Sequence, residues 1–487
     1  MTKDPARADR WALALCIAMA ALLVIPARAH AHAFLLGSDP PMGQAVAVAP
    51  RTLTLRFSER VQLLKPSDMQ VVTRTGRSVE AGPAVVDPAH VNEITVPLQP
   101  HLSPGTYTVR YVVVSADSHI VGAALPFAVG SGPVGPPFLG QRPGQGPSET
   151  GAWSVSSRFM ELVGLCGLVG LLGFRWLVWR PIWGRGSTRT ASIAPADREH
   201  ILAWGRDAFW LAMSSTAVAA MAAELYLLVV YSATALGTSV SRTLGDAAGI
   251  GSVISSTRLG HLIQLRGVFL FGVFALGAWQ LITESGSPGQ PKTTPRPAGA
   301  PVPAAVMALL LVGVLWGLSS QGHASQAPLA LLQEAADLIH MAAAAVWVTG
   351  LLMLIVALWR LPHVAPRGGA AVATELLTRF SRVALISVAV VVLTGTVRAV
   401  AELSDPAQLW DQPYGRSILY KVGLLTLAGG LALRNRRLTL TLSRRAASHP
   451  RALTSVRRAA AMELVLAVVI VLVAALLVGQ PPGRFSG

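Results

Sequence analysis

The sequence has few charged residues and almost no cysteine for a chain of 487 residues. Charged residues make up 13% of the chain, whereas an average soluble domain has about 25%. This scarcity excludes a soluble globular protein and an intrinsically disordered one. The two cysteines, Cys16 and Cys166, both lie in apolar stretches, which excludes a disulfide framework and a zinc finger with thiolate ligands. A phosphate-binding loop of the type Gly-x-x-x-x-Gly-Lys is also absent, so the chain is not an ATP-driven pump.

The positive charge of the chain follows from membrane topology. Forty Lys and Arg against 24 Asp and Glu give a net charge of +16, which at first suggests a nucleic-acid partner. The arginines, however, lie between long apolar runs, where the positive-inside rule expects them. We therefore expect membrane lipid as a partner and no nucleic acid.

The first residues have the three parts of a signal peptide. Lys3, Arg7 and Arg10 precede the apolar segment 11–25, which is too short to span a bilayer as a helix. Small residues then allow cleavage after Ala29 or after Ala31. We predict a signal peptide over 1–31 and a mature chain that begins outside the cytoplasmic membrane. An uncleaved membrane anchor is the alternative.

Residues 32–130 are expected to form a small all-β domain. Leu53, Leu55 and Phe57 alternate with polar residues, as in a half-buried strand. The segments 107–113 and 125–129 show the same alternation, and turn residues separate them. Such a pattern over about 100 residues predicts a β-sandwich or barrel. The segment 131–152 is rich in Gly and Pro, so we predict a linker there.

Residues 153–487 are expected to form an all-α bundle of eight transmembrane helices. Each predicted span is close to the 20 residues that a bilayer core requires. The spans are 157–179, 207–232, 259–283, 303–320, 329–358, 381–401, 417–434 and 459–479.

The distribution of basic residues orients these spans. Lys and Arg concentrate in the connections 180–206, 284–302, 359–382 and 434–458, which places those connections in the cytoplasm. Eight spans then leave both the β domain and the C-terminus outside, in agreement with the signal peptide. We predict a multi-pass protein of the bacterial cytoplasmic (inner) membrane.

Three residues of the β domain are candidate copper ligands. Cleavage after Ala31 exposes His32, whose α-amine and imidazole chelate a metal as one residue. Asp117 and His119 are two residues apart, so an extended backbone directs both side chains to one face. Ligation rich in nitrogen with one carboxylate suits Cu(II). The alternative is that Asp117 and His119 are solvated turn residues. His90 and His101 are taken as surface residues.

Residues 32–130 resemble the CopC copper-binding domain. The resemblance implies an Ig-like, cupredoxin-like Greek-key sandwich and a Cu(II) site formed by the mature N-terminal histidine, here His32, with the Asp-x-His pair, here Asp117 and His119. The segments that carry the resemblance are 32–40, 53–59, 102–109 and 114–119.

Polar residues of the membrane domain are expected in the outer half of the bilayer. Ionisable groups in lipid are costly, and they mark functional sites more often than chance. Asp337 and His340 are three residues apart and share a helix face, and Met341 offers a soft thioether for Cu(I). Each residue is also explained by helix packing or by a hydrogen bond between helices. The candidate membrane metal site comprises Glu161, Glu224, His261, His323, Asp337, His340 and Met341.

The segment 322–436 resembles the CopD copper-resistance membrane domain. The matching residues include Gly322-His323-Ala324, Asp337 with His340, and Arg379-Phe380-Ser381. Together the two resemblances imply a CopC–CopD fusion protein.

These observations lead to one main functional hypothesis. The β domain captures Cu(II), periplasmic copper carriers are candidate partners that deliver it, and the membrane domain imports copper as Cu(I) or Cu(II). We do not expect an enzyme. A haem-binding redox protein that uses His261, His323 and His340 is one alternative. A copper-buffering or resistance protein without translocation is the other.

Overall fold

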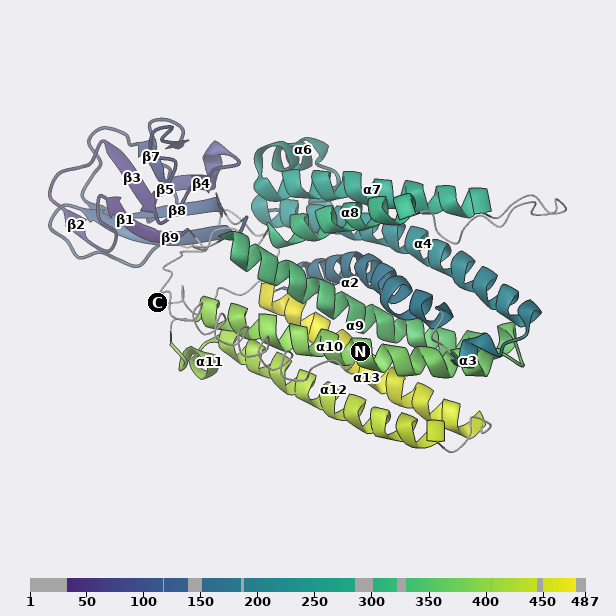
Figure 1. Ribbon diagram of the computed structural model, residues 1–487. Helices are drawn as coiled ribbons and strands as arrows, with labels where there is room; N and C mark the ends of the chain where they lie inside the picture. Colours follow the sequence, from purple (N-terminus) through teal and green to yellow (C-terminus); the bar gives the residue numbers. More distant parts are fainter. Residues whose placement is uncertain are drawn as a thin grey trace.

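A computed structural model describes residues 33–116, 118–138, 151–184, 188–284, 301–321, 330–403, 405–444 and 450–478. Within these ranges the chain forms a β domain followed by a helical bundle, and the β domain lies at one end of the bundle (Figure 1). The predicted signal peptide and the candidate ligands His32, Asp117 and His323 lie outside the described residues.

The β domain is a sandwich of two sheets, as predicted. One sheet has the strand order β1-β3-β7-β6 and the other β2-β9-β8-β4, with β5 also paired to β8. The strands are β1 Leu35–Asp39, β2 Ala45–Val46, β3 Thr52–Phe57, β4 Val61–Gln62, β5 Met69–Thr73, β6 Val85–Val86, β7 Glu93–Pro97, β8 Gly105–Ser115 and β9 Ile120–Val129.

The alternation in the sequence produces the sandwich core. Leu53, Leu55 and Phe57 of β3 are fully buried, while the alternate residues Thr52 and Arg56 are exposed. Burial of one such side chain stabilises the fold by about 1.5–3 kcal/mol. The second sheet contributes aromatic side chains to the same core.

In the part of the chain that the structure describes, eight long helices form the bundle. They are α2 Ala152–Phe174, α4 Pro195–Ala235, α7 Arg258–Glu284, α8 Pro301–Ser319, α9 Ala330–Val364, α10 Gly369–Glu402, α12 Pro413–Arg444 and α13 Pro450–Val478. Shorter helices connect them: α3 Thr188–Ala191, α5 Val240–Leu244, α6 Ala247–Ser256 and α11 Gln408–Asp411. Among the described residues, 7 helices are long and apolar enough to cross a membrane, and α8, at the fourth predicted span, is a shorter apolar helix.

The two ends of the bundle sequence lie on the same side. Ser156, near the start of α2, hydrogen-bonds Tyr226 late in α4, and Tyr231 of the same helix contacts the β domain. At the other end of the sequence, the Val478 carbonyl of α13 lies 3.3 Å from His119 Nε2 of the β domain. A chain that enters and leaves the membrane at the same side crosses it an even number of times. Eight crossing helices, α8 included, meet this condition.

Small residues allow the central helices to pack closely. At Gly170 of α2, a Cβ atom would collide with the Ala345 carbonyl and with the Thr349 side chain of α9. Close backbone approach at small residues is a common basis of helix association in membranes. It places α2 and α9 in direct contact, and with them the polar residues that both helices carry.

Candidate metal sites

The loop that carries two of the predicted copper ligands is a tight turn between β8 and β9. Ser115 N–H donates to the His119 carbonyl at 2.9 Å, and Ser118 N–H donates to the Ser115 carbonyl at 2.9 Å. Ser118 has a φ of 72°, in the left-handed region. The chain reverses within five residues to pair Val114 with Ile120, so the backbone at Ser118 and His119 forms the turn that the sequence left open as the alternative to an extended strand.

The N-terminal segment reaches the same end of the sandwich as this turn. Phe34 N–H donates to Ser58 Oγ at 2.9 Å, and Ser58 N–H donates to the Phe34 carbonyl at 2.8 Å. Val61, shortly after Ser58, pairs with Ser115 in the β4–β8 ladder. The chain directly after position 32 and the turn that carries His119 are thus both neighbours of the segment 58–61.

The turn is seated on the membrane domain. Tyr231 Oη of α4 donates to the Ser118 carbonyl at 3.0 Å, and Arg258 Nη1 of α7 lies 3.5 Å from the Ala116 carbonyl. Gln62 Nε2 of β4 donates to the Ser256 carbonyl at the end of α6 at 2.6 Å. We call these contacts, with that of His119 to Val478, the seat of the β domain.

Apolar contacts reinforce the seat. Leu64 and Ile120 of the β domain pack against a cluster of buried side chains from the ends of α4, α6 and α7. The buried members of this cluster include Leu227, Tyr231 and Val253. The seat therefore combines hydrogen bonds to backbone carbonyls with a small hydrophobic contact, and it fixes the turn over one end of the bundle.

Two of the predicted membrane ligands are ion-paired to a buried arginine. Arg266 of α7 is 0% exposed, and its Nη2 lies 3.0 Å from Glu161 Oε1 of α2 and 2.7 Å from Glu224 Oε2 of α4. Its Nη1 donates to Gln321 Oε1 at 2.7 Å and to the Gly317 carbonyl at 3.1 Å. We call this group the Arg266 cluster.

Asp337 and His340 belong to a second group, between α9 and α10. Arg398 of α10 is ion-paired to Asp337, and His340 Nδ1 lies 2.9 Å from Thr394 Oγ1. Arg398 and Thr394 are four residues apart, so one face of α10 meets the shared face of α9 predicted from the spacing. Arg398 Nη2 also lies 3.5 Å from Glu402 Oε1.

The remaining predicted residues lie apart from these groups. His261 is exposed near the start of α7, and Met341 is buried in the core between helices. Among the described residues, the groups of three or more His, Cys, Asp or Glu with converging ligand atoms do not include any residue of the bundle. The described candidate membrane ligands thus have different partners and do not form one ready-made metal site.

Three features were missed by reasoning from sequence. Arg266 and Arg398 neutralise the predicted carboxylates, and a charged residue inside an apolar run such as 259–283 is a signal that could have identified Arg266. His90, taken as a surface residue, contacts Asp87 and lies near Glu93. The repeated spacing of three between these residues was the available signal.

Fold and sites together define a class: a multi-pass helical membrane protein with a β-sandwich domain seated on one end of its bundle. Comparison with protein families specifies that class. The CopC domain model matches residues 35–130, and the model of copper resistance protein D, CopD, matches residues 374–477. The chain belongs to the CopC–CopD fusion proteins, as the sequence resemblance implied. Both are families of copper binding, transport or resistance.

Relatives match either the whole architecture or the β domain alone. Copper transport protein CutJ of Bacillus subtilis is 23% identical over 427 residues, which cover 85% of this chain and 69% of CutJ. Protein YobA of Escherichia coli is 35% identical over 124 residues, which cover 26% of this chain and 96% of YobA. The crystal structure of CopC from Methylosinus trichosporium OB3b has 31% identity and a TM-score of 0.18, and covers 20% of this chain and 93% of that one.

Proposed function

We propose that the chain imports copper across the bacterial cytoplasmic membrane. In this proposal the β domain captures Cu(II) outside the membrane through His32, Asp117 and His119, and the helical domain passes copper inward. The relative CutJ, named a copper transport protein, is similar along most of this chain, which supports transport over binding alone. The predicted signal peptide and the cytoplasmic Lys and Arg support the orientation, with both the β domain and the C-terminus outside.

The observation that carries the proposal is the seat of the β domain. The turn 115–119 lies against the bundle, where Tyr231 and Arg258 contact its carbonyl groups. The contacts of Tyr231 and Arg258 use backbone carbonyls of the turn, and His119 Nε2 itself lies 3.3 Å from the Val478 carbonyl of α13, so a predicted ligand of the β domain touches the bundle directly. A domain that only buffered copper would have no need to place its ligand turn against the helices.

Below the seat, α4 connects the β domain to the Arg266 cluster. Tyr231 and Glu224 are seven residues apart and so lie on one face of α4, about 10 Å apart along the helix. The Arg266 cluster is therefore the first buried charged group below the turn. An ion that enters there meets two carboxylates held by one guanidinium, and it must displace Arg266 to bind them.

Copper accumulation in cells tests the proposed direction. In a host that lacks the gene, we expect wild-type protein and His101→Ala to raise cellular copper, and His119→Ala to fail. His101 is an exposed loop residue of the β domain, so His101→Ala is a matched control. Export would lower cellular copper, and a buffering protein would leave it unchanged while it altered copper tolerance; either result contradicts import. A haem absorbance in the purified chain would favour the redox alternative.

Copper binding to the purified full chain tests the capture site. Electron paramagnetic resonance of bound Cu(II) is expected to show a nitrogen-rich tetragonal site. An additional alanine before His32 blocks the chelate of amine and imidazole, and we expect affinity to fall about tenfold or more. Unchanged affinity in that variant and in His119→Ala would contradict the proposed ligand set.

A further inference from the structure

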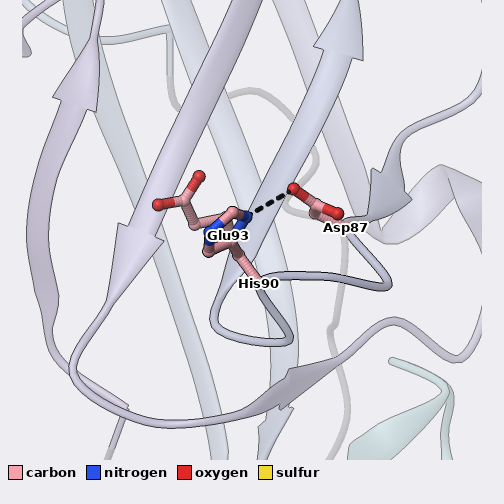
Figure 2. A group of neighbouring side chains, drawn as sticks. All are labelled: Asp87, His90 and Glu93. Carbon is pink, nitrogen blue, oxygen red and sulfur yellow. Dashed lines mark hydrogen bonds and ion pairs between the residues drawn. The ribbon is translucent and has the colours of Figure 1, made fainter.

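A second group of metal-type ligands lies in the β domain, in the turn between β6 and β7. Asp87, His90 and Glu93 each offer one ligand atom, and these atoms lie within 4.8 Å of one another. Figure 2 shows the imidazole of His90 between the two carboxylates. His90 Nδ1 lies 2.9 Å from Asp87 Oδ2. Atoms that bind one ion at about 2 Å lie about 3–3.5 Å apart, so small side-chain rotations suffice to bring all three onto one ion.

The backbone of this turn already holds the three residues in place. Asp87 N–H donates to the Glu93 carbonyl at 3.0 Å, Glu93 N–H to the His90 carbonyl at 2.8 Å, and His90 N–H to the Asp87 carbonyl at 3.2 Å. Asn92 Nδ2 donates to the Phe57 carbonyl of β3 at 2.9 Å and anchors the turn to the sheet. Because little backbone ordering remains to be done on binding, the entropic cost of forming the site is small.

The local charge favours a cation. The two carboxylates face one guanidinium, that of Arg56, whose Nε lies 2.7 Å from Glu93 Oε1. The Arg56 side chain is 60% exposed, so it can turn into solvent when a metal ion takes its place. The hydrogen bond between His90 and Asp87 lowers the pKa of Asp87 and raises that of His90.

We propose that Asp87, His90 and Glu93 form a binding site for a divalent transition-metal ion, separate from the copper site proposed at His32, Asp117 and His119. One imidazole and two carboxylates suit borderline ions such as Zn²⁺, Ni²⁺ or Cu²⁺. The set contains no thiolate or thioether, which soft Cu(I) prefers. Water completes the coordination, since His90 is exposed. This proposal does not depend on import by the membrane domain.

The proposed site lies next to β4, the strand that pairs with the start of the turn 115–119. The Asn92 carbonyl accepts from Phe57 N–H at 2.8 Å, and the Val91 carbonyl accepts from Val61 N–H at 3.0 Å. Val61 in turn pairs with Ser115, where the turn that carries His119 begins. The two proposed sites thus lie on either side of β4. An ion held at Asp87, His90 and Glu93 is close to the turn 115–119, which carries two of the proposed copper ligands.

Zinc titration of the purified full chain tests the proposal, because Zn²⁺ has no redox chemistry. We expect His90→Ala to lose one bound zinc ion per chain, or to bind it about tenfold or more weakly, whereas His101→Ala behaves as wild type. His119→Ala is expected to leave this zinc ion in place. All three histidines lie in loops at the surface of the sandwich, so these variants leave the buried core intact.

Removal of one negative charge at the site, compared with removal of one elsewhere, separates a specific site from general attraction to an acidic surface. Asp87→Asn is expected to weaken zinc binding as His90→Ala does, and Glu80→Gln, an acidic residue elsewhere in the sandwich, is not. Equal zinc stoichiometry and affinity in wild type, His90→Ala and Asp87→Asn would overturn the proposal. An equal loss in His101→Ala or Glu80→Gln would also overturn it, since binding would then be adventitious.

Discussion

In the β domain, Asp87 and His90 lie on a turn at the surface, whereas in the bundle the candidate carboxylates Glu161, Glu224 and Asp337 are buried and each contacts an arginine. His90 is exposed in the turn after β6, and Glu161 and Glu224 are 2% and 3% exposed around Arg266. Each arrangement follows from its solvent. A turn in water can leave ligands open, but a carboxylate in lipid requires a counter-charge.

This difference separates two ways of binding an ion. At the site proposed in the β domain, a metal would displace water from residues that the backbone already positions. In the bundle it must displace a guanidinium that makes four contacts, to Glu161, Glu224, Gln321 and the Gly317 carbonyl. Binding in the bundle is therefore coupled to movement of a buried side chain, whereas in the β domain only exposed side chains such as Arg56 have to move. The following predictions test this contrast, from the largest effect to the smallest.

Removal of Arg266 should cause the largest loss in the free energy of unfolding. Arg266→Met leaves Glu161 and Glu224 buried without a counter-charge, and we expect a loss of about 3–5 kcal/mol in stability. Thermal unfolding of the detergent-solubilised chain measures it. The triple variant with Glu161→Gln and Glu224→Gln should regain most of the loss, because no buried charge is then uncompensated. An unchanged melting temperature in Arg266→Met would contradict the cluster.

Arg398→Gln should lower the free energy of unfolding by less than Arg266→Met, because water reaches the Arg398 side chain. It is 32% exposed, whereas Arg266 is 0% exposed, and we expect a loss of about 1–3 kcal/mol. The same unfolding experiment compares the two arginines directly. A larger loss for Arg398→Gln than for Arg266→Met would reverse the order that burial predicts.

Tyr231→Phe should loosen the seat at a smaller cost. It removes the hydrogen bond to the Ser118 carbonyl, worth about 0.5–1.5 kcal/mol. Spin labels at two exposed positions, one in each half, report the distance between the β domain and the bundle, and we expect a broader distribution. Tyr226→Phe is the matched control, since Tyr226 lies on the same helix and bonds Ser156 within the bundle. Equal broadening in both variants would count against a specific seat.

The smallest effect concerns the core of the β domain at alkaline pH. Burial raises the pKa of Tyr111 to about 12, whereas a tyrosine in the unfolded chain has a pKa of about 10. The stability that the neutral phenol contributes is complete below pH ~10 and is lost as the pH rises towards ~12. Burial raises the pKa of Tyr107 as well, so ultraviolet titration should show a late-ionising fraction that decreases, but does not vanish, in Tyr111→Phe. Ionisation near pH 10 would indicate that water reaches the ring.

Periodic features of this fold could be predicted from sequence because their cause is local. The alternation around Leu53 predicts β3, and apolar runs of bilayer length predict the spans, since each pattern reports burial of one face or one segment. The pairing of Asp337 and His340 on one helix face also follows from their spacing. Each of these predictions depends only on residues that are close together in the sequence.

Partners from distant segments could not be predicted in this way. Arg266 lies 42 positions from Glu224 and 55 from Gln321, and no local pattern joins them. At Ser118 the sequence left a strand and a turn open, because ligands spaced by two suggest a strand, and only the pairing of β8 with β9 decides for the turn. The group at Asp87, His90 and Glu93 arises from a turn in which every third residue returns to the same side.

The seat has a kinetic consequence for any ion carried in the turn 115–119. A domain joined to its receiver by a short tether is present at an effective concentration of about millimolar, and contacts such as that of Gln62 with Ser256 raise this value further. Delivery then becomes a first-order event within one chain. The rate of delivery from a loaded turn is then independent of the concentrations of the protein and of copper. The copper concentration outside governs only how often the turn is loaded.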